Sequence, residues 1–585
     1  MPKTFLVQAI LVDRLLHRFL ASAQGRASSL LALLTCLLLG GGIVFAADNQ
    51  TDRSLLEILQ SEIQREFEAL KAKANPAPYF LAYEVMDEQS VSASASLGAV
   101  MNSAQHQQRG VDTTIRVGSP KFDNYHPYRG APARFTTFTA LSLDDDANQI
   151  KRALWAESDH VYRLASRRFL QLQTDSQLLA QQASEDADFS SEERASYAQL
   201  PPIYRFDTDA WTGKLRGWSA EFRTHPKILG SGVSFQAERE VRTLVNTEGT
   251  AVQQGSNLFR VEVQAAALAP DGMELSDFAS FEASDPAHLP SDKMVETKVQ
   301  ALANRLDALV NAPPAEPIVC PAILSGRASA VFFHEIFGHA IEGHRQKNME
   351  EGQTFTKMLN QKVLPDFISV EFDPTRKQFD GADLIGSYEY DDEGVKSRPV
   401  KLVEGGVLKT FLLSRSPVGE FQHSNGHGRR QPGYEVESRQ SNLIVESSRQ
   451  VSDSELRRQL IAEIKRQSKP YGLYFEEVSS GYTTTARRGL QAFTVVPLVV
   501  YRVYADGRPD ELVRGVDIVG TRLASFSKIL ATSDKSDVFN GYCGAESGSI
   551  PVSAISPAIL ISEVETQKKA NSQQQLPILP RPVAE

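Results

Sequence analysis

The 585-residue sequence has few cysteines, no excess of positive charge and no internal repeat. Three cysteines, Cys36, Cys320 and Cys543, are too few for a disulfide scaffold. The 62 basic residues face 72 acidic ones, a net charge of −10, so nothing attracts the chain as a whole to phosphate backbones. We therefore expect no nucleic-acid ligand. With 41% hydrophobic and 23% charged residues, the composition excludes collagen-like and wholly disordered chains. The length predicts several globular domains.

A single long apolar run stands near the N-terminus, from Ser28 to Ala46, behind a basic segment. This order of charged, apolar and small residues is typical of a secretory signal peptide, with cleavage expected after Ala46. The run could also cross a bilayer as an uncleaved anchor. We expect residues 1–46 to be a signal peptide and the protein to be exported to the bacterial periplasm. A membrane anchor through residues 28–46 is the open alternative.

Apolar spacing divides the rest of the chain into two parts. Helical periodicity over 53–72 and 146–180 and alternation typical of strands over 80–86, 91–97, 111–117, 233–245 and 251–268 precede a helix capped at Ser291. Prolines 313 and 314 end that helix. We predict an N-terminal α+β domain over 47–312 with an antiparallel sheet and long helices.

The second part begins with a short buried strand at 318–324 and an apolar helix through Ile341. Turn signals then separate many short strands, and Ser452 caps one further helix. We predict a β-rich domain over 313–565 that carries this helix, followed by a disordered tail over 566–585. The predicted fold class for the whole chain is α+β.

The apolar helix contains an unusual set of ionisable residues, His334, Glu335, His339, Glu342 and His344. Burying such groups is costly unless they are paired, and a metal ion would pair them. In the common zinc motif HExxH the histidines are four apart and lie on one helix face. Here they are five apart, which we expect a π-bulge at Gly338 to accommodate. The opposing interpretation is that these histidines are ordinary core residues.

Two further polar segments admit simple interpretations. Glu342 and His344 can be surface residues near the end of the helix, with His344 as a substitute metal ligand at most. The acidic residues of 391–394 fit a solvated turn.

The pattern His334-Glu335-xxx-His339 resembles the TldD/PmbA family of zinc metallopeptidases, on its metal-bearing TldD side. The resemblance covers roughly residues 318–564. It includes the lead-in segment 321–326, the acidic turn 391–394, the Gly-Arg-Arg stretch at 426–430 and the Cys-Gly segment at 541–544. The non-metal members of the family lack the His-Glu-xxx-His pattern, so its presence favours the catalytic branch.

The resemblance implies one zinc ion per chain, bound by His334, His339 and Cys543, with Glu335 as the general base. Two imidazoles and a thiolate suit a catalytic zinc, which keeps one position open for water. The Gly-Arg-Arg stretch adds Arg429 and Arg430 as candidates for binding substrate carboxylates, against the alternative of a solvated turn.

The resemblance also implies peptides or unfolded proteins as substrates, bound in extended form. Family members work as paired assemblies, so we expect a homodimer or a heterodimer with a related subunit. Their description as modulators of DNA gyrase implies cytoplasmic work with DNA, which the export signal and negative charge oppose.

Two alternatives to the peptidase stay open. The first is a non-catalytic envelope protein, either with a structural His/Cys metal site or with a Cys320–Cys543 disulfide that removes the third ligand. The second is hydrolysis of a non-peptide amide by the same chemistry.

Overall fold

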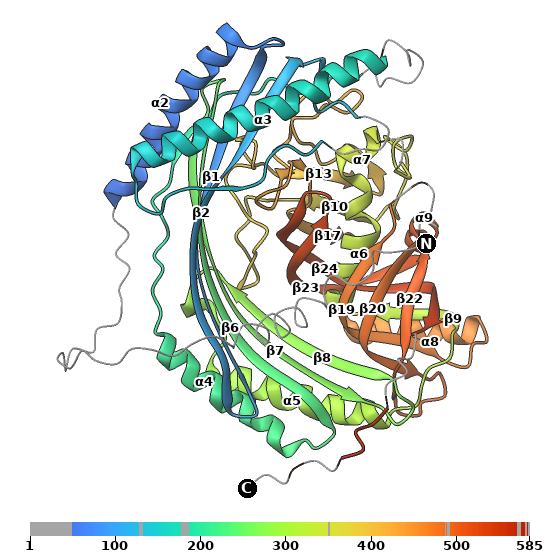
Figure 1. Ribbon diagram of the computed structural model, residues 1–585. Coiled ribbons are helices and arrows are strands. Elements are labelled where there is room, and N and C mark those ends of the chain that lie inside the picture. The colour runs from blue at the N-terminus through green and yellow to red at the C-terminus, as the bar shows by residue number, and fades with distance from the viewer. Residues whose placement is uncertain are drawn as a thin grey trace, which may run out of the picture. The chain divides into compact units, whose positions relative to one another are not determined.

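The computed structural model describes residues 49–127, 133–176, 186–348, 351–485, 487, 492–569, 575–579 and 582 (Figure 1). The predicted signal peptide, including the apolar run 28–46, lies outside the described residues. So does half of the predicted tail over 566–585, and the last strand extends three residues into this tail, to Lys568. Among the described residues, no helix is both long enough and apolar enough to cross a membrane.

The N-terminal part forms an eight-stranded sheet, counted over the described residues, in which long antiparallel strands lie side by side. The central order is β3-β2-β1-β6-β7-β5, with β4 beside β2 and β8 beside β7. The two strands predicted at 80–86 and 91–97 are one continuous strand, β1. The strands are β1 (Pro78–Ser96), β2 (Ala99–Ser119), β3 (Phe122–Asp123), β4 (Thr139–Ala140), β5 (Ser196–Ala198), β6 (Ile228–Asn246), β7 (Ala251–Leu268) and β8 (Glu274–Ala283).

Helices cover one face of this sheet (Figure 1). They are α2 (Asn49–Lys73), α3 (Ala147–Ser176), α4 (Thr208–Ala220) and α5 (Asp292–Asn311), with short 3-10 turns η1 (Glu221–Thr224) and η2 (Pro286–His288). Strand residues two apart point to the same face, so the odd-numbered apolar residues of β1 and β6 pack against the helices. Trp211 of α4, for example, stacks on Phe235 of β6 at 4.1 Å between ring centroids.

The C-terminal part is built on a second sheet, of twelve strands within the described residues. Strands β24, β22, β20, β19 and β9 pair in sequence, and β24 also pairs with β9, so these five close into a ring. The strands are β9 (Val319–Leu324), β10 (Ile368–Phe372), β13 (Val400–Glu404), β14 (Val407–Leu408), β17 (Asn442–Ser447), β18 (Gln450–Val451), β19 (Gly472–Thr483), β20 (Ala492–Val503), β21 (Glu511–Val513), β22 (Val516–Thr521), β23 (Ile529–Ala545) and β24 (Gly548–Lys568).

Smaller elements complete this part. Two-stranded ribbons pair β11 (Gln378–Phe379) with β12 (Ala382–Asp383) and β15 (Gly428–Arg429) with β16 (Glu437–Ser438). The helices are α6 (Gly326–Ile336), α7 (Gly343–Lys347), α8 (Asp453–Arg466) and α9 (Arg522–Phe526), with the 3-10 turn η3 (Gly338–Ile341). The mixture of helices and largely antiparallel sheets confirms the predicted α+β class. The predicted cap of α8 is present, since the Ser452 hydroxyl accepts a hydrogen bond from the Glu455 N–H.

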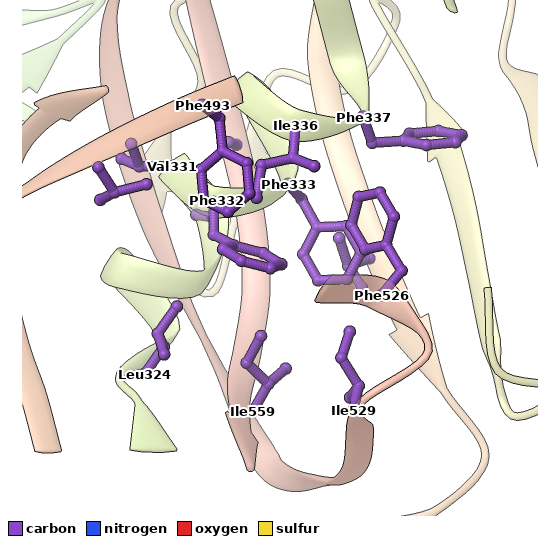
Figure 2. Packing of buried hydrophobic residues seen from close by; sticks show 14 of the residues in the cluster. Leu324, Val331, Phe332, Phe333, Ile336, Phe337, Phe493, Phe526, Ile529 and Ile559 are labelled. Carbon is purple, nitrogen blue, oxygen red and sulfur yellow. The ribbon is translucent and has the colours of Figure 1, made fainter. Parts of the chain in front are cut away.

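Helix α6 is anchored in the largest apolar core of the molecule. Figure 2 shows Phe332, Phe333 and Ile336 of this helix among side chains from β20, β23, β24 and α9. The ring of Phe333 stacks on Phe526 at 5.6 Å. Aromatic side chains buried this well contribute several kcal/mol each, so α6 is a rigid platform for the polar residues it carries.

The other face of the N-terminal sheet is polar and contacts the C-terminal part. Glu84 of β1 accepts a hydrogen bond from Nε of Arg430 at 2.7 Å, and Arg242 of β6 pairs with Asp392. Both sheet residues are at even-numbered positions, opposite the helix-covered face. Strands β1–β8 belong to one large sheet and β9–β24 to the other or to small ribbons, a division that falls between 283 and 319.

Candidate metal centre

The His334–His339 segment is a broken helix. Helix α6 ends at Ile336 and a 3-10 turn begins at Gly338, so the predicted π-bulge is wrong. The Phe337 N–H still donates to the Phe333 carbonyl, after which the chain tightens and the Ala340 N–H donates to Phe337. A change in helix type, rather than an extra residue in one turn, compensates for the spacing of five.

This break brings the two histidines together with a cysteine 204 residues further along the chain. The ligand atoms of His334, His339 and Cys543 all lie within 4.8 Å of one another. Sγ of Cys543 is 3.4 Å from Nε2 of His339, and the two imidazole rings are 5.2 Å apart at 83°. Cys543 lies near the end of β23, so the β23–β24 hairpin carries the thiol to the turn that follows α6.

Charges around the thiol favour its ionised form. Burial alone would raise the pKa of Cys543, but His339 and Arg439 hold it well below its ordinary value. Burial would likewise lower the pKa of His339, but Cys543 and Glu342 raise it well above its usual range. Thiolate is the form of cysteine that binds metals. The surroundings therefore prepare Cys543 as a ligand without a metal present.

Glu342 supports His339 from behind. Its carboxylate is fully buried, lies 3.4 Å from Nδ1 of His339 and accepts a hydrogen bond from Nε of Arg345 at 2.9 Å. Nε of Arg439 lies 3.5 Å from its other oxygen. Burial would raise the pKa of Glu342, but His339 and Arg345 lower it to about 2. A carboxylate behind a histidine fixes the ring and its tautomer, an arrangement typical of metal-binding histidines.

Glu335 is adjacent to the first histidine and is 8% exposed. Burial raises the pKa of its carboxyl above the usual range, although His339 and His334 oppose the shift. Gly481 of β19 lies directly against its side chain. A buried carboxylate with a raised pKa beside the cluster has the character of a general base.

The other cysteine and the third histidine of the segment lie elsewhere. Cys320 and Cys543 are both free thiols. Cys320 sits in β9 opposite Val564, and burial raises its pKa to about 12. The ring nitrogens of His344 lie 3.8 Å from Glu437 and 3.7 Å from Glu546, and this residue is not part of the His334–His339–Cys543 group.

The predicted solvated turn at 391–394 is wrong. Asp391 is 2% exposed and accepts hydrogen bonds from the N–H groups of Glu393, Val395 and Gly428. A carboxylate that collects several backbone N–H groups fixes the path of the surrounding loops.

The Gly-Arg-Arg stretch is also buried rather than solvated. Arg430 pairs with Glu84, while Nη1 of Arg429 donates to the carbonyls of Gln440 and Pro551 at 2.8 and 2.9 Å. Both guanidinium groups are therefore committed to contacts within the chain.

The sequence pattern singles out none of three further contributors to the site, Arg439, Gln440 and Gly481, and it leaves open whether Glu342 is a surface residue. Glu342 was detectable, since it follows His339 by three positions in an apolar segment and could reach back to it. The others lie far from the motif along the chain, and no local pattern marks them.

The chemistry of the donor set fits a zinc ion. Two imidazoles and a thiolate lie close enough to share one ion. The His339 ring is supported by Glu342, and the backbone carbonyl of Cys543 is held by Arg439. Three protein ligands leave a fourth position for water or substrate, as in catalytic rather than structural sites.

Comparison with known proteins finds similarity to metallopeptidases, strongest over the C-terminal part of the chain. Residues 317–568 match the model described as the PmbA/TldA metallopeptidase C-terminal domain. A metalloprotease of Methanocaldococcus jannaschii is 27% identical over 330 residues, which cover 56% of this chain and 68% of that protein. A zinc metalloprotease TldD homolog of Saccharolobus solfataricus is 24% identical over 248 residues, covering 42% and 51%.

The fold agrees with this result. The crystal structure of TldE from Thermococcus kodakarensis superimposes with a TM-score of 0.56 at 16% identity, covering 87% of this chain and 99% of that one. Several curated relatives are named metalloproteases, which supports a peptidase, a hydrolase of peptide bonds, at the level of the family. The part of the chain over residues 317–568 is a C-terminal domain of the TldD/PmbA family.

Proposed function

We propose that this protein is a zinc-dependent peptidase that cleaves extended peptides or unfolded proteins. The observation that carries the proposal is the convergence of His334, His339 and Cys543, with the buried carboxylate of Glu335 beside them. A structural zinc site has no use for such a carboxylate, whereas peptide hydrolysis needs a group that can accept a proton.

In this proposal His334, His339 and Cys543 hold the zinc ion. When bound, zinc acts as a Lewis acid that lowers the pKa of a water molecule to about 7 and polarises the peptide carbonyl. Glu335 accepts the proton of the attacking water and passes it to the leaving amine nitrogen. The raised pKa of Glu335, caused by burial, suits it to both transfers, because the carboxyl holds a proton more readily than an exposed glutamate does.

The preference for extended substrates follows from burial. His339 is 6% exposed and Cys543 3% exposed, so the surface of a folded protein would not reach them. The polar face of the N-terminal sheet also approaches the site, where Arg260 of β7 lies over the ring of Tyr542 at 4.9 Å. An extended chain can enter such a site and offer its backbone to hydrogen bonding.

That Arg429 and Arg430 bind the substrate directly remains a prediction. Their contacts with Gln440, Pro551 and Glu84 favour a supporting part instead. Replacing either arginine by lysine keeps the charge, so an effect on KM alone would indicate contact with the substrate.

The test uses one protein in two states. A reduced, carboxymethylated substrate that cannot fold should be cleaved, and its native disulfide-bonded form should not. A chelator should abolish cleavage and added zinc should restore it. Cleavage of both forms at similar rates would contradict the proposed selectivity, and cleavage that survives the chelator would contradict the zinc chemistry.

We also propose that the protein acts outside the cytoplasm and assembles as a dimer, with itself or a related subunit. The apolar run behind a basic N-terminal segment supports export. Fractionation of cells with N-terminal sequencing of the product tests export and cleavage, and light scattering of the purified protein tests assembly.

A further inference from the structure

Two consecutive residues, Arg439 and Gln440, contact two of the candidate ligands directly, Cys543 and His334, and the third, His339, through Glu342. Arg439 donates from Nη2 to the Cys543 carbonyl at 2.6 Å, and its Nε faces Glu342, which supports His339. Gln440 contacts the remaining ligand, His334. The short segment between β16 and β17 therefore helps to hold all three candidate ligands in position.

The Gln440 side chain is fully buried and lies against His334 in two ways. Its Nε2 is 3.5 Å from Nε2 of the His334 ring and 3.4 Å from the His334 carbonyl oxygen. Its amide oxygen is buried with no hydrogen-bond partner among the described residues. An apolar side chain of the same size would fill this space without burying an unpaired carbonyl, so packing alone does not account for an amide here.

The amide also lies on the break in the helix. A Cβ placed on Gly338 would be 1.9 Å from Oε1 and 2.4 Å from Cδ of Gln440. Only glycine leaves room for this approach. Gln440 thus touches the chain at the first histidine and at the turn that carries the second.

We propose that Gln440 is a positioning residue that orients the His334 imidazole for metal binding. This inference rests on the proposed metal site. It adds to that site an uncharged residue that is not itself one of the three metal ligands. Outer partners that fix a ligating histidine typically change metal affinity by about 10–100-fold when removed. We expect a loss of that size, together with a changed ligand geometry.

The experiment titrates the metal-depleted full chain with Co²⁺, following the cobalt d–d and thiolate absorption bands, and then displaces cobalt with Zn²⁺. Gln440→Leu and Gln440→Met keep most of the volume and remove the amide. Gln253→Leu is the matched control, because Gln253 of β7 is 5% exposed, also has an unpartnered amide atom, and belongs to the N-terminal sheet.

Both Gln440 variants should bind one cobalt per chain about 10–100-fold more weakly, with altered d–d bands, while the control matches the parent protein. Two variants of Gln440 are used so that the test remains possible if one of them fails to fold. Affinities within about twofold of the parent and an unchanged spectrum would overturn the inference, as would an equal loss in Gln253→Leu.

The design separates this inference from the proposed function. A parent protein that binds one metal but cleaves no peptide contradicts the peptidase and leaves the positioning effect measurable. A parent that cleaves peptide, with variants that bind metal normally, removes only the part assigned to Gln440. A parent that binds no metal overturns both.

Discussion

Gly481 of β19 lies so close to Glu335 that a Cβ on the glycine would be 2.4 Å from Cγ of the glutamate. The strand thus forms one wall of the space that holds the candidate general base. Because β19 pairs with both β9 and β20, this wall is part of the closed ring of strands and has little freedom to move. The position of Glu335 is therefore set by the sheet as well as by its own helix.

Gly481→Ala should displace Glu335 while leaving the three ligands in place. A catalytic group misplaced by about 1 Å can cost on the order of 100-fold in rate, so we expect a fall of that order in kcat with zinc content unchanged. Gly230→Ala is the matched control, since Gly230 also lies in a strand and no atom approaches its Cβ position within 4 Å. Peptide hydrolysis and elemental analysis of both variants check the prediction; a Gly481→Ala protein of full activity would contradict it.

The two cysteines should respond differently to replacement. Cys543→Ala removes a ligand and should abolish stoichiometric zinc binding. Cys320→Ala should leave zinc binding intact, because Cys320 lies in β9 and is not part of the ligand group. Zinc content and a free-thiol count of both variants show whether only Cys543 is needed for zinc binding. Equal loss of zinc in the two would contradict their separate roles, and a parent protein with no zinc and no free thiols would indicate the disulfide alternative.

Glu342→Gln should weaken the site and the fold at once. The substitution keeps the shape of the side chain but leaves the buried Arg345 and Arg439 without their shared carboxylate. Removing one partner of a buried ion pair costs about 3–5 kcal/mol, and loss of the carboxylate behind His339 should lower zinc affinity by at least about 10-fold. Chemical denaturation and zinc competition measure the two effects. The control Glu455→Gln removes a partly exposed partner of the exposed Arg458 and should change neither.

Stability should fall with rising pH because of Glu238 on the polar face of the N-terminal sheet. Burial, with Glu240 and Glu88 nearby, raises its pKa from 4.5 to about 7. The folded state therefore holds a proton that the unfolded state releases, so this carboxyl destabilises the fold progressively as pH rises from about 4.5 to 7. Glu238→Gln should leave the melting temperature unchanged at pH 5 and raise it at pH 8. Equal shifts at both pH values would contradict the assignment.

Local patterns in the sequence predicted much of the fold. Helices α2, α3, α5 and α8 and strands β6 and β7 lie where periodicity and caps place them, which leaves a short turn between the two strands. At that turn the Asn246 side chain accepts hydrogen bonds from the N–H groups of Glu248 and Thr250, a contact that the residue types favour. These features depend on residues a few positions apart, which a single sequence contains.

Features that depend on distant contacts were not predictable. At the break in the helix, Gln440, about a hundred positions further along the chain, fills the space that a side chain on Gly338 would need. Asp391 is buried because it collects the N–H of Gly428, and its own neighbours look like an exposed turn. The motif and the family resemblance identify the residues of the candidate centre from the sequence. Their supporting residues, Glu342, Arg439 and Gly481, are identified only by the packing in the structure.

The most direct test of the account compares Glu335→Gln with the parent protein in one experiment, measuring zinc per chain and hydrolysis of an unfolded substrate. The account predicts about one zinc in each protein and a loss of hydrolysis by at least about 100-fold in the variant, because the ligands are intact and the proton acceptor is gone. A variant that holds zinc and cleaves as fast as the parent would contradict the role of Glu335. A parent that holds zinc and cleaves nothing would show that the centre is structural.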